Sequence, residues 1–156
     1  MRELDALIAQ ARMFSDLEPR YLELIAGCAR NERVGAGTLL VREGDPADRF
    51  FLIRSGTVAL EVHAPGRGPL VIETLHDGDM VGWSWLFAPY RWQLDGRATE
   101  PCALVAFDGA CLRGKCEADH ELGYQLMRRF AANLVARLQA TRFQLLDVYG
   151  HVASFA

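Results

Sequence analysis

The stretch from Gly44 to Val58 reads GDPADRFFLIRSGTV, and it decides the fold class. A short apolar run, Phe50–Ile53, lies between two turn signals, Gly-Asp-Pro and Arg-Ser-Gly, and the next apolar run starts directly after the second turn. Parallel strands need long crossover connections, whereas antiparallel strands are joined by turns of this length. The stretch therefore predicts antiparallel strands of a sandwich or jelly roll.

The same pattern continues on both sides of this stretch. Short apolar runs alternate with glycine- and aspartate-rich turns, and in one of them Val58, Leu60 and Val62 alternate with other residues, as a half-buried strand requires. We expect a mainly β domain with its roll over residues 31–107 and strands at Thr38–Val41, Phe50–Ile53, Thr57–Val62, Leu70–Leu75 and Cys102–Phe107.

Helical periodicity flanks the predicted strands. Short helices are expected within residues 1–30, where Ser15 and Glu18 have the spacing of a capping box. Longer helices are expected within residues 108–150, where Leu122, Leu126 and Phe130 form a stripe that would pack on the roll. A second stripe has the 3,4 spacing of a coiled-coil seam and comprises Tyr124, Met127, Ala131, Leu134, Leu138, Thr141, Leu145 and Val148.

This long helix with two apolar faces predicts a homodimer. The alternative is a helix that lies wholly on its own roll. The sequence by itself leaves both arrangements open.

Composition excludes several classes of protein. The 156 residues are enough for one domain, 1–156, and a formal net charge of −3 argues against a protein that coats nucleic acid or a membrane surface. No apolar run reaches the about 18–20 residues of a membrane span, and the N-terminus lacks an apolar signal core. These features predict a cytoplasmic protein in which the cysteines are thiols, namely Cys28, Cys102, Cys111 and Cys116.

Three segments together resemble a known family. Phe14–Leu17 (FSDL), the stretch 44–58 and residues 75–82 (LHDGDMVG) are similar, in this order, to the cyclic-nucleotide-binding domain of the Crp/Fnr (catabolite activator) family. The resemblance extends from about Phe14 to Tyr149. It implies an eight-stranded β-roll with short N-terminal helices and a long C-terminal dimerisation helix, which agrees with the outline above.

The same resemblance also concerns DNA binding. DNA-binding members continue past the long helix with a helix-turn-helix domain, and only residues 151–156 follow here. The resemblance therefore implies a stand-alone domain without direct DNA binding.

The resemblance also places a phosphate cassette at residues 82–98, which read GWSWLFAPYRWQLDGRA. In ligand-competent relatives a Gly-Glu pair opens the cassette and binds the ribose hydroxyl, and an arginine about ten residues later pairs with the phosphate. Here Gly82 matches, but Trp83 stands at the glutamate position and Trp92 at the arginine position, with Arg91 and Arg97 as candidate replacements. Loss of the glutamate contact predicts about ten- to a hundredfold weaker binding.

The expected ligand is thus a cyclic nucleotide, cAMP or cGMP, or another small anion, and further residues are candidates to hold it. Ser84 offers a hydroxyl beside the cassette helix. Thr141 matches a threonine that touches adenine in the family, and Arg142 stands where that family protein has serine. The tryptophans Trp83, Trp85 and Trp92 either stack on a planar ligand or fill the pocket and close it, and both interpretations stay open.

Cysteine and histidine chemistry gives only a weak candidate site. Cys111, Cys116 and His120 have metal-like spacing, although a structural zinc site usually shows two paired ligand sets, and buried thiols are the alternative. The sequence contains no nucleophile elbow, HExxH or P-loop, so we expect no enzyme.

Together these features predict a non-catalytic regulatory or sensor module with a divergent cassette. One alternative is a dimeric interaction protein that docks on a partner enzyme or transcription protein. A weaker alternative is a thiol or metal redox sensor. No membrane partner is expected.

Overall fold

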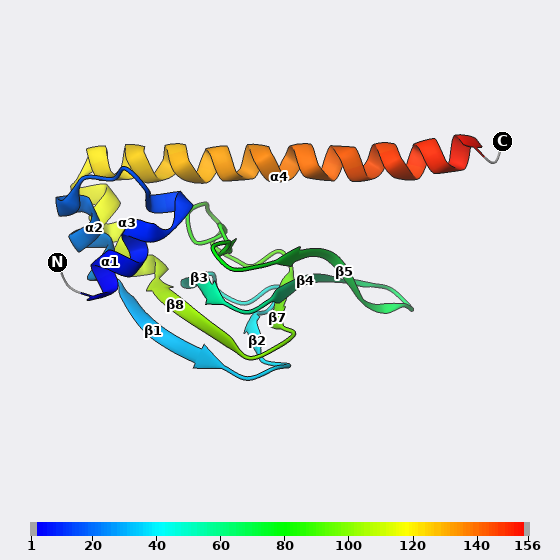
Figure 1. Cartoon of the computed structure of the whole chain (residues 1–156), viewed down its shortest axis with the longest axis horizontal. Coiled ribbons are helices and arrows are strands. Elements are labelled where there is room, and N and C mark those ends of the chain that lie inside the picture. Colours follow the sequence, from blue (N-terminus) through cyan, green and yellow to red (C-terminus); the bar gives the residue numbers. More distant parts are fainter. Residues whose placement is uncertain (1–2, 155–156) are drawn as a thin grey trace.

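The computed structural model describes residues 3–154, with side chains to residue 150. Eight strands in this part of the chain form a roll, and helices cover one end and one side of it (Figure 1). In chain order the elements are α1 (Glu3–Gln10), the 3₁₀ helix η1 (Arg12–Phe14), α2 (Pro19–Ala26), β1 (Ala29–Val34), β2 (Leu39–Val41), β3 (Arg49–Ser55), β4 (Val58–Ala64), β5 (Gly68–Leu75), β6 (Met80–Val81), β7 (Asp95–Ala98), β8 (Cys102–Asp108), α3 (Gly109–Ala118) and α4 (His120–Ser154).

The strands form two antiparallel sheets of four, in the orders β1-β8-β3-β6 and β2-β7-β4-β5. The predicted β-roll is confirmed, as are the five expected strands. The turn glycines Gly44, Gly56 and Gly78 all have positive φ, as their places between strands require.

An aromatic cluster joins the roll to the segment after β6 and to α4. Phe50 of β3 stacks on Phe107 of β8 with ring centroids 4.6 Å apart, and on Trp85 at 4.4 Å. Phe130 of α4 packs edge-on against Trp85 at 5.4 Å. These buried rings tie the sheet, the segment after β6 and the long helix into one core.

Helix α4 runs along the roll and continues beyond it (Figure 1). The predicted roll-facing stripe is confirmed, because Leu122, Leu126 and Phe130 are buried. The alternative in which the whole helix lies on its own roll is wrong, because every residue from 138 to 150 is exposed where α4 leaves the roll. The apolar side chains of the predicted seam are exposed at Tyr124, Met127, Leu138, Leu145 and Val148. No helix in residues 3–154 has the length and apolar character needed to span a bilayer.

The predicted capping box at Ser15 and Glu18 is wrong. The Ser15 hydroxyl donates to the Arg12 carbonyl at 3.0 Å, at the end of η1. Helix α2 instead begins at Pro19, and Glu18 precedes it without a side-chain cap bond. Proline suits the first helical position because its missing N–H has no partner there in any helix.

The expectation of four free thiols is also wrong. Cys28, between α2 and β1, forms a disulfide with Cys111 of α3, with the two Cα atoms 5.8 Å apart. The thiols of Cys102 and Cys116 stay free. Because burial raises the pKa of both these thiols, they are poor nucleophiles near neutral pH.

This disulfide predicts a loss of stability when it is removed. The bond closes a loop over a sequence separation of 83 residues, and we expect Cys28→Ser to lower the free energy of unfolding by about 2–4 kcal/mol. Urea unfolding without reductant measures the loss, and Cys116→Ser is the control that leaves the bond intact. Thiol titration of the unfolded, unreduced wild type should find two thiols, and a count of four would contradict the assignment.

Candidate functional site

The predicted cassette forms the segment between β6 and β7. Hydrogen bonds pin it to the turn before β3: the Gly44 amide donates to the Trp92 carbonyl at 2.9 Å, and the Trp92 amide donates to the Asp45 carbonyl at 3.1 Å. Gly82 opens the segment with φ +100°, and the six-membered ring of Trp92 lies against its Cα. The backbone at Gly82 thus accepts no side chain without moving this ring.

Four of the predicted ligand residues meet around one small cavity. Gly82, Trp83, Ser84 and Trp92 line it, and the other lining residues are Val41, Leu60, Val81, Gln93 and Leu94. Its volume is about 70 Å³, whereas ligand pockets usually measure about 300–1,000 Å³. Trp92, which is 6% exposed, occupies this part of the roll. The cassette therefore has no room for a nucleotide in this conformation.

The third tryptophan does not line this cavity. Trp85 is fully buried in the aromatic cluster, between Phe50 and Phe130. From α3, Arg113 donates a hydrogen bond to the Trp85 carbonyl and places its guanidinium over the Tyr90 ring. Of the two interpretations left open by the sequence, filling of the core fits the positions of Trp85 and Trp92.

Neither cassette arginine lines the small cavity. Arg91 donates to the Gly44 carbonyl at 2.9 Å on the outside of the segment. Arg97 of β7 pairs with Glu61 of β4 at 2.9 Å and donates to the Gly37 carbonyl at 3.0 Å. The phosphate contact that the resemblance implied for these arginines is thus not prepared at the small cavity, because both side chains are directed to other partners.

The remaining predicted ligand residues lie on α4. Thr141 donates its hydroxyl to the Arg137 carbonyl at 3.0 Å, within the helix. Arg142 follows it on an exposed part of the helix, and neither residue lines a cavity that the structure describes. The weak metal candidate was the set Cys111, Cys116 and His120. It loses one possible ligand, because the Cys111 sulfur is bonded to Cys28.

A buried carboxylate lies on the outer face of the second sheet. Asp95 of β7 accepts from the Glu43 amide at 2.7 Å and contacts His63 Nε2 at 2.8 Å. Burial raises the pKa of Asp95, but the Glu43 amide and His63 outweigh it, and the net pKa is lowered. The folded state therefore favours the charged carboxylate.

The lowered pKa of Asp95 predicts a pH-dependent contribution to stability. We expect Asp95→Asn to cost about 1–3 kcal/mol at pH 7. The difference from wild type should be complete above the unfolded pKa of about 3.9 and vanish as the pH falls through the lower folded pKa. Urea unfolding from pH 2 to pH 7 measures it, with exposed Asp45→Asn as the control. A difference that grows as the pH falls below about 4 would contradict the sign.

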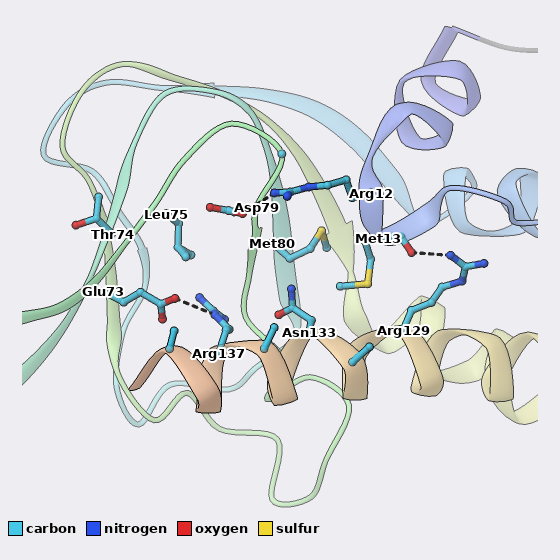
Figure 2. Close-up of a pocket in the computed structure, with 14 residues that line it drawn as sticks. Arg12, Met13, Glu73, Thr74, Leu75, Asp79, Met80, Arg129, Asn133 and Arg137 are labelled. Carbon is cyan, nitrogen blue, oxygen red and sulfur yellow. Dashed lines mark hydrogen bonds and ion pairs between the residues drawn. The ribbon is translucent and has the colours of Figure 1, made fainter. Parts of the chain in front are cut away.

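A second cavity was missed by the sequence analysis. It measures about 510 Å³ and lies between η1, the end of β5 with the following turn, and α4 (Figure 2). Arg137 rises into it from α4 and pairs with Glu73 of β5 at 3.2 Å. The sequence did carry a signal, because the roll-facing stripe of α4 continues beyond Phe130, with steps of three and four residues, through Asn133 and Arg137.

Comparison with known proteins supports the fold and the family. The family model described as cyclic nucleotide-binding domain matches residues 31–119. A CRP-like cAMP-activated global transcriptional regulator of Mycobacterium tuberculosis is 26% identical over 145 residues, which cover 93% of this chain and 63% of the regulator. The chain thus spans less than two thirds of the length of that relative.

Two solved structures with the same fold come from different kinds of protein. A putative cyclic nucleotide-binding protein from Geobacter metallireducens is 30% identical, with a TM-score of 0.78 and coverage of 88% of this chain and 99% of that one. The regulatory domain of Toxoplasma gondii PKA with cAMP is 20% identical, with a TM-score of 0.63 and coverage of 71% and 42%. The second likeness concerns the fold alone.

Proposed function

Because the chain belongs to the cyclic nucleotide-binding domain family, we propose that it is a non-catalytic regulatory module. Its roll and α4 together hold a small ligand, and the exposed face of α4 forms a homodimer. Ligand binding between roll and helix then alters how the two long helices pack. In this way the dimer reports whether ligand is bound.

The observation that carries this proposal is the division of α4 into two apolar faces. One face is buried on the roll, and Phe130 makes it continuous with the aromatic cluster. The other is a row of exposed apolar side chains that includes Met127, Leu138 and Leu145. Exposed apolar rows of this length mark interaction surfaces, and their 3,4 spacing suits a second copy of the same helix.

The closed cassette supports a ligand other than cAMP or cGMP. Trp83 stands where the resemblance implies the ribose-binding glutamate, and an indole accepts no hydrogen bond. The cavity beside it holds about 70 Å³, and Arg91 and Arg97 are bonded elsewhere. We therefore propose that neither nucleotide binds in the cassette as it is folded here.

The dimer is tested on its predicted seam. The double substitution Leu138→Glu and Leu145→Glu would bury four carboxylates in an apolar dimer interface, two from each chain. We expect sedimentation equilibrium to show a wild-type dimer and at least a hundredfold larger dissociation constant for the variant.

The matched control is Gln139→Glu with Gln144→Glu, which adds the same charge at exposed polar positions of the same helix. Its dissociation constant should stay near that of the wild type. A monomeric wild type, or a seam variant that dimerises as tightly as wild type, would overturn the proposal.

A further inference from the structure

The cavity between β5 and α4 contains an arginine whose hydrogen-bonding capacity is mostly unused. The side chain of Arg137 is 14% exposed, and its Nε donates to Glu73. Both terminal nitrogens, Nη1 and Nη2, are buried and have no hydrogen-bond partner among the described residues. Buried donors on a charged group are nearly always paired in proteins, so these two nitrogens point to an acceptor that the chain itself does not supply.

The geometry of Arg137 is that of a prepared anion site. Trp83 packs against the guanidinium, with Cζ 4.7 Å from the ring centroid, and Glu73 holds Nε at 3.2 Å. These two contacts fix the orientation of the planar group. A fixed guanidinium offers two parallel donors, which match the two oxygens of a carboxylate or a phosphate.

The charges around the cavity also favour an anion. Three arginines line it, Arg12, Arg129 and Arg137, against two acids, Glu73 and Asp79. Each acid already faces an arginine, since Asp79 lies 3.4 Å from Arg12 and Glu73 lies 3.2 Å from Arg137. The ionised side chains therefore leave one net positive charge in the lining.

The rest of the lining is mostly apolar. Figure 2 shows Met13 and Met80 across from α4, with Leu75 beside them and Arg137 and Asn133 rising from the helix. Three alanines of α4 complete the helix side of the lining, namely Ala132, Ala136 and Ala140. With about 510 Å³, the cavity is in the usual size range of small-molecule sites, about 300–1,000 Å³.

We propose that this cavity binds a small organic anion, with its carboxylate or phosphate on Nη1 and Nη2 of Arg137 and its apolar body against Met13, Leu75 and Met80. The inference rests on the proposed function, because it names the ligand class and the site for the sensor. It differs from the cassette cavity: the two share no lining residue, and Trp83, which lines the cassette cavity, packs against Arg137. Bound there, the ligand touches α4, η1 and the turn after β5 at once.

Binding in this cavity would change how firmly α4 is attached to the rest of the domain. Arg129 of α4 donates to the carbonyls of Met13 and Ser15, at 3.1 and 2.6 Å, so the helix and the N-terminal segment already hold each other. An anion on Arg137 adds a contact two helical turns further along α4, toward the exposed seam at Leu138. The ligand therefore strengthens the attachment of α4 to the roll.

The test uses octanoate and octyl phosphate as anionic probes and octanamide as the neutral control, measured by calorimetric titration of the full chain. We expect at least one anionic probe to bind and octanamide to bind much more weakly. Arg137→Gln should weaken binding of the anion about ten- to a hundredfold. The preference between octanoate and octyl phosphate tells whether carboxylate or phosphate is the natural group.

Two further variants keep the test decisive. Arg128→Gln removes an exposed arginine of the same helix that lines no described cavity, and its affinity should stay within about twofold of wild type. Ala136→Leu narrows the cavity without touching Arg137, and it should weaken binding even if Arg137→Gln fails to fold.

Three results would overturn the inference: equal binding by Arg137→Gln, equal binding of octanamide, or no binding of any probe at millimolar concentration. If this occurs while the wild type is a dimer that the seam substitutions dissociate, only the ligand site is wrong. A monomeric wild type contradicts the proposed function itself.

Discussion

Trp85→Ala should remove about 3–5 kcal/mol from the free energy of unfolding, the cost of truncating a fully buried large aromatic side chain. The loss is expected to be this large because the ring contacts two parts of the core at once. It stacks on Phe50 at 4.4 Å and meets Phe130 of α4 at 5.4 Å. A cavity there separates the cassette from both the sheet and the long helix.

Urea unfolding followed by circular dichroism measures this loss. Trp85→Phe is the informative control, because Nε1 of the indole is buried without a partner among the described residues and phenylalanine keeps an aromatic ring at that place. We expect it to cost only about 1 kcal/mol. Equal costs for alanine and phenylalanine would show that the stacked cluster is not what holds this segment.

Gly82→Ala should be the second most damaging substitution, with an expected loss of about 3–5 kcal/mol. Two effects add. The residue has φ +100°, which side chains rarely adopt, and a Cβ built there would fall on ring atoms of Trp92, far inside van der Waals contact. Trp92 must then leave the roll, or the chain before it must shift.

The two effects can be separated by experiment. Gly37→Ala is the matched control for backbone strain, because Gly37 has φ +88° and no neighbouring atom within 4 Å of an added Cβ. We expect it to cost about 1–2 kcal/mol. The double variant Gly82→Ala, Trp92→Leu should show a favourable coupling, because the clash with the indole is gone. Equal losses for Gly82→Ala and Gly37→Ala would mean that Trp92 does not fill this space.

Much of the fold could be predicted because most strands carry an apolar pattern between turn residues. Three strands were not predicted. β6 has only two residues, and the other two strands are polar: β1 reads ARNERV and β7 reads DGRA. In β7 the inward residues are small, and a Cβ on Gly96 would already touch Val41. A strand with glycine and alanine on its inner face shows no apolar alternation, so only pairing with β4 and β2 reveals it.

The candidate site was only partly predictable. Motif spacing led to Gly82, Trp83, Ser84 and Trp92, and the structure brings these four together. Spacing gave no information on the disulfide, because Cys28 and Cys111 are 83 residues apart and meet only after the roll closes. Arg137 was missed for a related reason: a single arginine in a helix becomes distinctive only when its surroundings are known to be buried.

Native mass spectrometry of the purified chain, alone and with excess cAMP or cGMP, shows whether the chain is a dimer and whether its cassette is closed. We expect a species of two chains whose mass neither nucleotide changes. A single-chain species would contradict the role proposed for the exposed face of α4. A dimer that gains one nucleotide per chain, and still gains it after Arg137→Gln, would contradict the closed cassette, because the small cavity beside Trp83 and Trp92 would have to open to admit it.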